Sequence, residues 1–328
     1  MRILAVDDDD IALELLSSAL KRAGYTDIVT AGSGADALGL IAAAPHPFDA
    51  FLLDIRMPGI DGIELCRQIK RMKLYRHSPV LMITAMQERH FIDEAFAAGA
   101  VDYVSKPFNP LELGVRVRIA ETLVEQARRV NTSRTEVDYL KSRTGMQSGF
   151  DVDEPIEIHD VSRVISQTAM ENYLLRLSLR MSYQSQSVTF AINGFRAIHA
   201  HAAAADTYDI LADVASAIAE GLKYTSHLVS YVGRGEFVAV ILGRSNALNA
   251  ETLFNIQSIL DDMEPCFGDG RTCPVTIQMG KVYVPSLWSA TERLNLLLKP
   301  QVGPLRRNRD ESLALPIGVG NTAKQFAA

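Results

Sequence analysis

Acidic side chains crowd the end of the first apolar run of the chain, Ile3–Val6, where four aspartates follow in a row. Carboxylates at the end of a buried strand repel one another and are costly to remove from water. A divalent cation held by oxygen ligands relieves both costs. We therefore expect a metal ion at Asp7 and Asp8. Asp9 and Asp10 have a simpler interpretation as acids at the positive end of a helix, with a metal role as the alternative.

Three further polar side chains follow apolar runs in the same way. Asp54 comes after Ala50–Leu53, Thr84 after Val80–Ile83, and Lys106 shortly after Val101–Val104. A carboxylate nucleophile, a hydroxyl and an ammonium beside a metal ion suit phosphoryl transfer. Asp54 would attack phosphorus, while Lys106 and the metal neutralise charge on the equatorial oxygens and Thr84 donates a hydrogen bond to one of them.

The elements that must position these residues alternate between apolar strands and helical patterns. The first helix is expected to be amphipathic, with Ile11, Leu15 and Ala19 on its apolar face and Gly24 as its stop. Other helices are expected over Gly34–Ala43, around Ile63, Leu65 and Ile69, up to about Ala98, and after the capping sequence Asn109-Pro110-Leu111-Glu112. Five such units predict an α/β fold with a doubly wound, five-stranded parallel sheet, in which ligands bind at the carboxyl ends of the strands.

Together these pieces resemble the receiver domain of two-component response regulators, with a flavodoxin-like fold, across residues 1–123. The resemblance lies in the acidic pair, the segment Leu53–Gly62, Thr84-Ala85 and Lys106-Pro107-Phe108. It implies that Asp54 is the phospho-acceptor and that Mg²⁺ is held by Asp7, Asp8, Asp54 and the carbonyl of Arg56. It also implies a cis peptide at Lys106-Pro107 and a conformational switch formed by Thr84 and Tyr103.

The last helix of this region is expected to continue into a linker over residues 124–154. Apolar and polar positions at four-three spacing run along it: Ile119, Leu123, Gln126, Val130, Ser133, Val137 and Leu140. This spacing is compatible with a coiled coil that pairs two copies of the chain. The alternative is one exposed helix packed on the chain's own second domain. Thr144–Glu154, which carries Gly145 and Gly149, is expected to be a flexible break.

The second domain is expected over residues 155–299, with a flexible tail over 300–328. Its pattern predicts a helix over Val161–Met181, strands over Ser187–Ile192, Leu228–Val232, Glu236–Leu242 and Val275–Val282, and helices over Ala204–Leu222, Asn249–Met263 and from Ser289. This order is α+β with an antiparallel hairpin at its centre. The hairpin Tyr231–Val238 resembles the signature turn of the GGDEF family of diguanylate cyclases, and Thr168–Asn172, Phe190–Arg196 and Val275–Gly280 resemble other segments of that family.

The residues that carry cyclase chemistry in that family are missing here. Ala191 stands at the position of a metal-binding aspartate, and Gly235 at that of the acid in the turn. His199 aligns with the guanine-contacting asparagine, and among the turn carboxylates only Glu236 remains. Because two metal-binding carboxylates are needed, we expect a degenerate GGDEF domain and no enzyme. The alternatives are sensing of GTP or cyclic di-GMP by this domain, or residual diguanylate cyclase activity.

Overall composition limits the classes of partner that the chain is expected to have. The 328 residues are 48% hydrophobic and carry a net charge of -6, which gives no sign of nucleic-acid binding. Cys66, Cys266 and Cys273 are too scattered for a disulfide framework, and no apolar run reaches membrane-spanning length. We expect a cytoplasmic response regulator that takes its phosphoryl group from a histidine kinase or phosphotransfer protein. Its output would be a downstream protein partner or homodimerisation, without nucleic acid or membrane.

Overall fold

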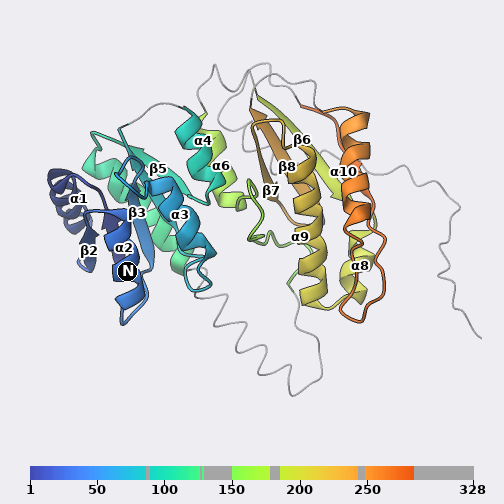
Figure 1. The fold of residues 1–328 in the computed structure, drawn as a ribbon, viewed down its shortest axis with the longest axis horizontal. Coiled ribbons are helices and arrows are strands. Elements are labelled where there is room, and N and C mark those ends of the chain that lie inside the picture. The colour runs from blue at the N-terminus through green and yellow to red at the C-terminus, as the bar shows by residue number, and fades with distance from the viewer. Residues whose placement is uncertain (86–88, 126–127, 129–149, 178–184, 243–247, 284–328) are drawn as a thin grey trace, which may run out of the picture.

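The computed structural model describes residues 1–85, 89–125, 128, 150–177, 185–242 and 248–283. These residues form an N-terminal unit (1–125) and a C-terminal unit (150–283), each with its own sheet (Figure 1). The expected stalk beyond residue 125, most of the expected flexible break, the helix from Ser289 and the tail lie outside the described residues.

The N-terminal unit has the expected doubly wound sheet. Its five parallel strands lie in the order β2-β1-β3-β4-β5. They are β1 Ile3–Val6, β2 Ile28–Ala31, β3 Ala50–Asp54, β4 Val80–Thr84 and β5 Asp102–Ser105. Strands β1, β3 and β4 are buried along their whole length, which explains their continuous apolar runs.

Helices cover both faces of this sheet: α1 Asp10–Arg22, α2 Gly34–Ala43, α3 Gly62–Arg71, α4 Arg89–Ala97 and a further helix whose described part spans residues 110–125. The Asp9 carboxylate accepts from the backbone N–H of Ile11, so its interpretation as a helix start is confirmed. The expected apolar face of α1 is wrong at two positions, because Ile11 and Leu15 are 69% and 58% exposed.

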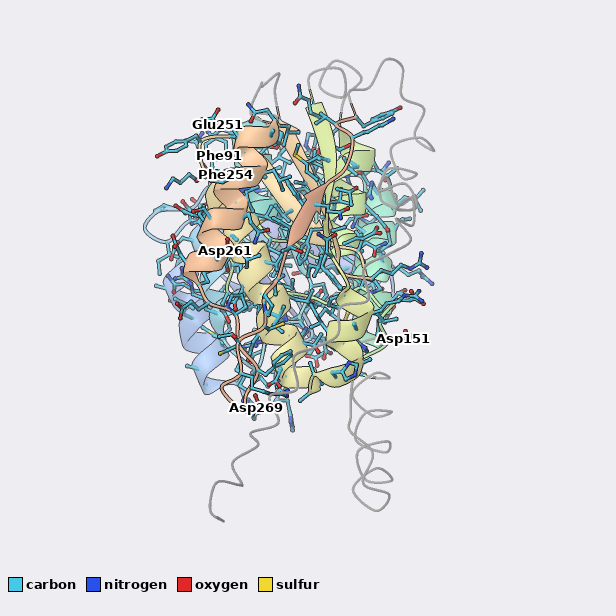
Figure 2. The ribbon with its side chains drawn as sticks, turned by 90° about the vertical axis from the view of Figure 1, so that its right-hand side faces the viewer. Phe91, Asp151, Glu251, Phe254, Asp261 and Asp269 are labelled. Carbon is cyan, nitrogen blue, oxygen red and sulfur yellow. The ribbon has the colours of Figure 1, made fainter. Side chains whose placement is uncertain are left out.

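The C-terminal unit is an α+β arrangement around a four-stranded antiparallel sheet in the order β7-β8-β6-β9. Its elements are α6 Gln167–Arg176, β6 Ser185–Ile192, α8 Phe195–His201, α9 Ala204–Gly221, β7 His227–Tyr231, β8 Glu236–Leu242, α10 Ala250–Asp262 and β9 Ile277–Met279. Helices α9 and α10 pack together, and their apolar side chains share a core with one set of sheet residues. Glu251, Phe254 and Asp261 are labelled on the outer side of α10 (Figure 2).

The helix α6 covers the opposite face of this sheet, where alternate residues of β7 and β8 point. It begins later than the expected Val161, because the backbone of Val164 and Ile165 pairs with Val229 of β7 and Ser166 then caps the helix. The side of α6 that points away from this sheet does not face solvent. It packs against the N-terminal unit, so that α6 lies between the two sheets, next to α4 (Figure 1).

Gly62, at the start of α3, lies against the backbone of Asp54 at the end of β3, and a substitution tests this close packing. A Cβ on Gly62 would lie 2.0 Å from the backbone oxygen of Asp54, whereas one on Gly39 in α2 would meet nothing within 4 Å. We expect Gly62→Ala to lower the free energy of unfolding by about 2 kcal/mol or more, because the backbone beside Asp54 must move. Gly39→Ala should raise it by about 0.5–1 kcal/mol. Urea unfolding of both variants checks this, and equal stabilities would contradict it.

Candidate functional site

Three aspartates meet at the carboxyl edge of the parallel sheet. Asp7 directly follows β1 and Asp54 ends β3, and both are buried, whereas Asp8 is exposed. One carboxylate oxygen from each lies within 4.8 Å of the others. Parallel pairing of β1 with β3 places their carboxyl ends side by side, which is how residues 47 positions apart come together. The expected acidic site is therefore assembled by the fold.

The ammonium of Lys106 joins two of these carboxylates. Its Nζ lies 2.6 Å from Oδ2 of Asp7 and 2.8 Å from Oδ1 of Asp54. Lys106 follows β5 and begins the Lys106-Pro107 peptide, which is cis as the resemblance implies. Backbone N–H groups hold the other oxygens: that of Arg56 donates to Asp54 Oδ2 at 2.9 Å, and that of Asp9 to Asp7 Oδ1 at 3.1 Å.

The electrostatics of the cluster favour an additional cation. Burial raises the pKa of Asp54, and the charge of Asp7 adds to this, while Lys106 and the N–H of Arg56 offset only part of the rise. Burial acts to lower the pKa of Lys106, but its ion pairs with Asp54 and Asp7 outweigh that effect and raise it. Three carboxylates and one ammonium leave two negative charges, which matches a divalent ion.

The oxygen-rich donor set fits Mg²⁺, which prefers carboxylate ligands and retains several waters. Asp7, Asp8 and Asp54 would hold it. Arg56, whose carbonyl is the fourth expected ligand, lines a surface hollow together with Asp8, Met57 and Asp61. The structure thus brings the three expected carboxylates together.

The two switch candidates lie on the neighbouring strands. Thr84 is buried at the end of β4, and its backbone oxygen accepts from the N–H of Lys106 at 2.6 Å. Tyr103 lies on β5, half-buried, with its ring 6.5 Å from that of Phe96 in α4. Both therefore lie between the acidic site and the surface formed by α4 and β5.

That surface is covered by α6, a contact that the sequence did not predict. We call it the α6 interface. The guanidinium of Arg176 lies 4.5 Å from the ring centre of Tyr103, and its Nε is 3.2 Å from Oδ1 of Asp102. The Tyr173 hydroxyl donates to Asp93 of α4 at 2.8 Å. Each large apolar side chain buried there contributes about 1.5–3 kcal/mol.

Asp102 receives two arginines at this interface. Arg116, on the helix over residues 110–125, donates to its Oδ2 at 3.0 Å, and Arg176 approaches Oδ1. Burial nevertheless raises the pKa of Asp102, with Arg176 and Arg116 acting in the opposite direction. Removing α6 would leave this buried carboxylate with one arginine fewer, so the two units are coupled electrostatically.

The hairpin turn of the C-terminal unit is contacted by the segment before α6, at Val152 and Asp153. Gly233, Arg234 and Gly235 all have positive φ, between 59° and 91°. The Arg234 side chain donates from Nε to Asp153 Oδ1 at 2.7 Å, and its backbone N–H donates to Val152. The side chain of Arg234 is therefore already paired with an acid of its own chain, which gives no support to the alternative in which this domain senses GTP or cyclic di-GMP through this turn.

The segment before α6 also contacts His199, which aligns with the guanine-contacting asparagine of the GGDEF family. Its Nε2 lies 2.8 Å from the backbone oxygen of Phe150. Neither His199 nor Ala191 belongs to a cluster of three metal-ligating side chains among the described residues.

Fold and site define the N-terminal unit as a doubly wound α/β domain with a cluster of aspartates at the carboxyl edge of its sheet. Residues 3–118 match the family of response regulator receiver domains, and this part of the chain is a receiver domain.

The chain is similar to the alkaline phosphatase synthesis transcriptional regulatory protein PhoP of Bacillus subtilis, with 40% identity over 117 residues, 36% of this chain and 47% of that protein. It is also 41% identical over 117 residues to the response regulator PleD of Caulobacter vibrioides, covering 36% of this chain and 25% of PleD. A solved structure of the chemotaxis response regulator CheY4 of Vibrio cholerae has 32% identity and a TM-score of 0.34, covering 36% of this chain and 97% of that one. The chain spans about half the length, or less, of the curated relatives it matches.

None of the described helices is long and apolar enough to cross a membrane.

Removal of Lys106 tests the electrostatic account of the site. Lys106→Met keeps the apolar stem but leaves two buried carboxylates without their shared cation, and should cost about 2–4 kcal/mol of unfolding free energy near neutral pH. The folded-state pKa of Asp54 is already raised and would rise further, so the loss should shrink as the pH falls and the carboxyls take up protons.

Urea unfolding at about pH 7.5 and about pH 5 measures this difference. The exposed Lys21→Met is the matched control and should stay within about 0.5 kcal/mol of the wild type at both pH values. A loss at Lys106 that does not depend on pH would contradict the assignment.

Proposed function

We propose that the chain is a response regulator of a phosphorelay that is phosphorylated on Asp54. The observation that supports this most directly is the placement of Asp54 beside Asp7 and Lys106, within the receiver-like part of the chain. Asp54 is the proposed nucleophile because its segment resembles the acceptor segment of receiver domains, and its two oxygens lie at Lys106 and at the backbone N–H of Arg56. The proposed roles of Asp7, Asp8 and Arg56 are to hold Mg²⁺.

The proposed reaction moves a phosphoryl group from a phosphohistidine to a carboxylate. An oxygen of Asp54 forms a bond to phosphorus as the bond between phosphorus and the donor's imidazole nitrogen breaks, and the imidazole leaves with the electron pair and takes up a proton. Mg²⁺ supplies charge neutralisation for the phosphoryl oxygens. Lys106 would shift from the Asp54 carboxylate to one of those oxygens, and the Thr84 hydroxyl would donate to another. The donor would be a histidine kinase or a phosphotransfer protein.

The proposed output is a change at the α6 interface rather than cyclase activity. When Lys106 and Thr84 turn to the phosphoryl group, Tyr103 on the neighbouring strand can take a different position. The guanidinium of Arg176 packs on the ring of Tyr103, so a movement of this ring weakens the packing of α6 on the N-terminal unit. A loosened α6 exposes the surface of α4 and β5 to a downstream protein or to a second copy of the chain. Sedimentation with and without beryllofluoride and Mg²⁺ tests the dimer.

The phospho-acceptor is tested by covalent labelling. Incubated with labelled phosphoramidate and Mg²⁺, the full chain should gain up to one phosphoryl group that hydroxylamine removes, as expected of an acyl phosphate. Asp54→Asn should lose this label at least about a hundredfold, because an amide in place of the proposed acceptor carboxylate does not attack phosphorus. Asp36→Asn, an exposed aspartate in the first turn of α2, is the control and should label like the wild type.

Removal of Mg²⁺ by a chelator should abolish labelling of the wild type as well. Full labelling of Asp54→Asn, or labelling that does not need a divalent ion, would contradict the proposed site.

A further inference from the structure

A second group of metal-ligating side chains lies far from the acidic site, where the two units meet. His77 follows α3 in the N-terminal unit, and Glu157 and His159 belong to the segment before α6. Nδ1 of His77 is 3.1 Å from Oε2 of Glu157, and Nε2 of His159 is 4.0 Å from the same oxygen. The ligand atoms of all three residues lie within 4.8 Å of one another.

One nitrogen of this group has no hydrogen-bond partner among the described residues. Nε2 of His159 has almost no contact with solvent and makes no hydrogen bond to them, although burying an unpaired polar atom costs free energy. The two imidazole rings meet nearly at right angles, with centroids 4.7 Å apart. The unpaired nitrogen of His159 therefore lies beside the carboxylate that also contacts His77, which is the arrangement a shared cation would satisfy.

Neighbouring contacts hold the ligands in place from both units. The backbone N–H of His159 donates to the hydroxyl of Tyr208 in α9 at 3.0 Å. On the other side, the Lys70 ammonium donates to the backbone oxygens of Arg76 and Ser78, on either side of His77. Ligands fixed by such outer contacts lose little freedom when a metal binds.

We propose that His77, Glu157 and His159 bind a divalent transition-metal ion, with Zn²⁺ the best match, across the junction of the two units. Two imidazoles and one carboxylate are a ligand set that zinc accepts, with a fourth position left for water. Zinc bonds of about 2.0–2.1 Å in tetrahedral geometry place ligand atoms about 3.3 Å apart. The His77–Glu157 pair, at 3.1 Å, is already close to this spacing, and Nε2 of His159, at 4.0 Å from the same carboxylate oxygen, has to come closer.

The surroundings set limits on affinity. Arg67, Lys70, Arg71 and Arg76 line a cavity beside the group, and their charges oppose a bound cation. Binding should therefore be weaker than at a closed structural zinc site. A bound ion would tie the N-terminal unit to the segment that leads into α6, so zinc should oppose release of the α6 interface.

The test is a titration of the full chain with Zn²⁺ against a chromogenic chelator, with excess Mg²⁺ present to fill the acidic site. The exposed Cys266 is changed to serine to remove an adventitious ligand. We expect one equivalent of zinc, bound at least about tenfold more weakly by His77→Ala and Glu157→Gln. The His77 side chain is 56% exposed, so its loss leaves the fold intact.

A matched control and a rescue variant complete the test. His201→Ala removes an exposed histidine of α8 whose Nδ1 lies 2.8 Å from the backbone oxygen of Ala197 in the same helix, and should bind zinc like the parent. His77→Cys should keep binding and give a sulfur-to-metal absorption band with Co²⁺, which a merely structural His77 would not produce. The proposal is overturned if the parent binds no zinc, or if His77→Ala binds it as tightly as the parent.

Discussion

The ion pairs of Lys106 with Asp7 and Asp54 are the interaction on which the rest of the N-terminal unit depends. They join the ends of β5, β1 and β3, three strands that are not all neighbours in the sheet. Two carboxylates buried this close are tolerated only with a cation between them. The same arrangement makes the site reactive in principle, because a cation that neutralises a carboxylate pair can also neutralise a phosphoryl group bound to one of its members.

The second important constraint is the packing of α6 against the receiver-like surface. Phe96 of α4 is 1% exposed because Tyr173 of α6 meets its ring edge-on at 5.2 Å. Asn172 donates to the backbone oxygen of Val101 at 2.8 Å, and Arg176 is shared between Asp102 and the Tyr103 ring. In the proposed function, a change at the acidic site would reach this contact through two adjacent strands, β4 and β5, without a long pathway. Coupling of the site to α6 then requires only that Tyr103 has two positions of similar energy.

Much of the N-terminal fold could be predicted because β1, β3 and β4 are continuous apolar runs that end in, or are followed by, a polar residue. Parallel topology then brings Asp7, Asp54 and Lys106 to one edge without further information. The face of α1 was mispredicted at Ile11 and Leu15 because they have the same helical spacing as the buried Leu13, Leu16 and Leu20, whereas the predicted Ala19 is buried. The α6 interface and the His77–Glu157–His159 group were missed for a different reason. The contacts described between the two units join residues 71 to 82 positions apart in the chain, and no local pattern signals such a contact.

The docking of α6 is tested most directly by the distance between the two units. Spin labels at Leu74→Cys and Tyr224→Cys, both exposed positions, report it in a Cys266→Ser background, since Cys66 and Cys273 are buried. Without phosphorylation, double electron–electron resonance should give one narrow distance. With beryllofluoride and Mg²⁺ the distribution should shift or broaden, and in Asp54→Asn it should stay unchanged under the same conditions. An identical distribution with and without beryllofluoride, in a chain that binds it, would contradict the proposed link between Asp54 and α6.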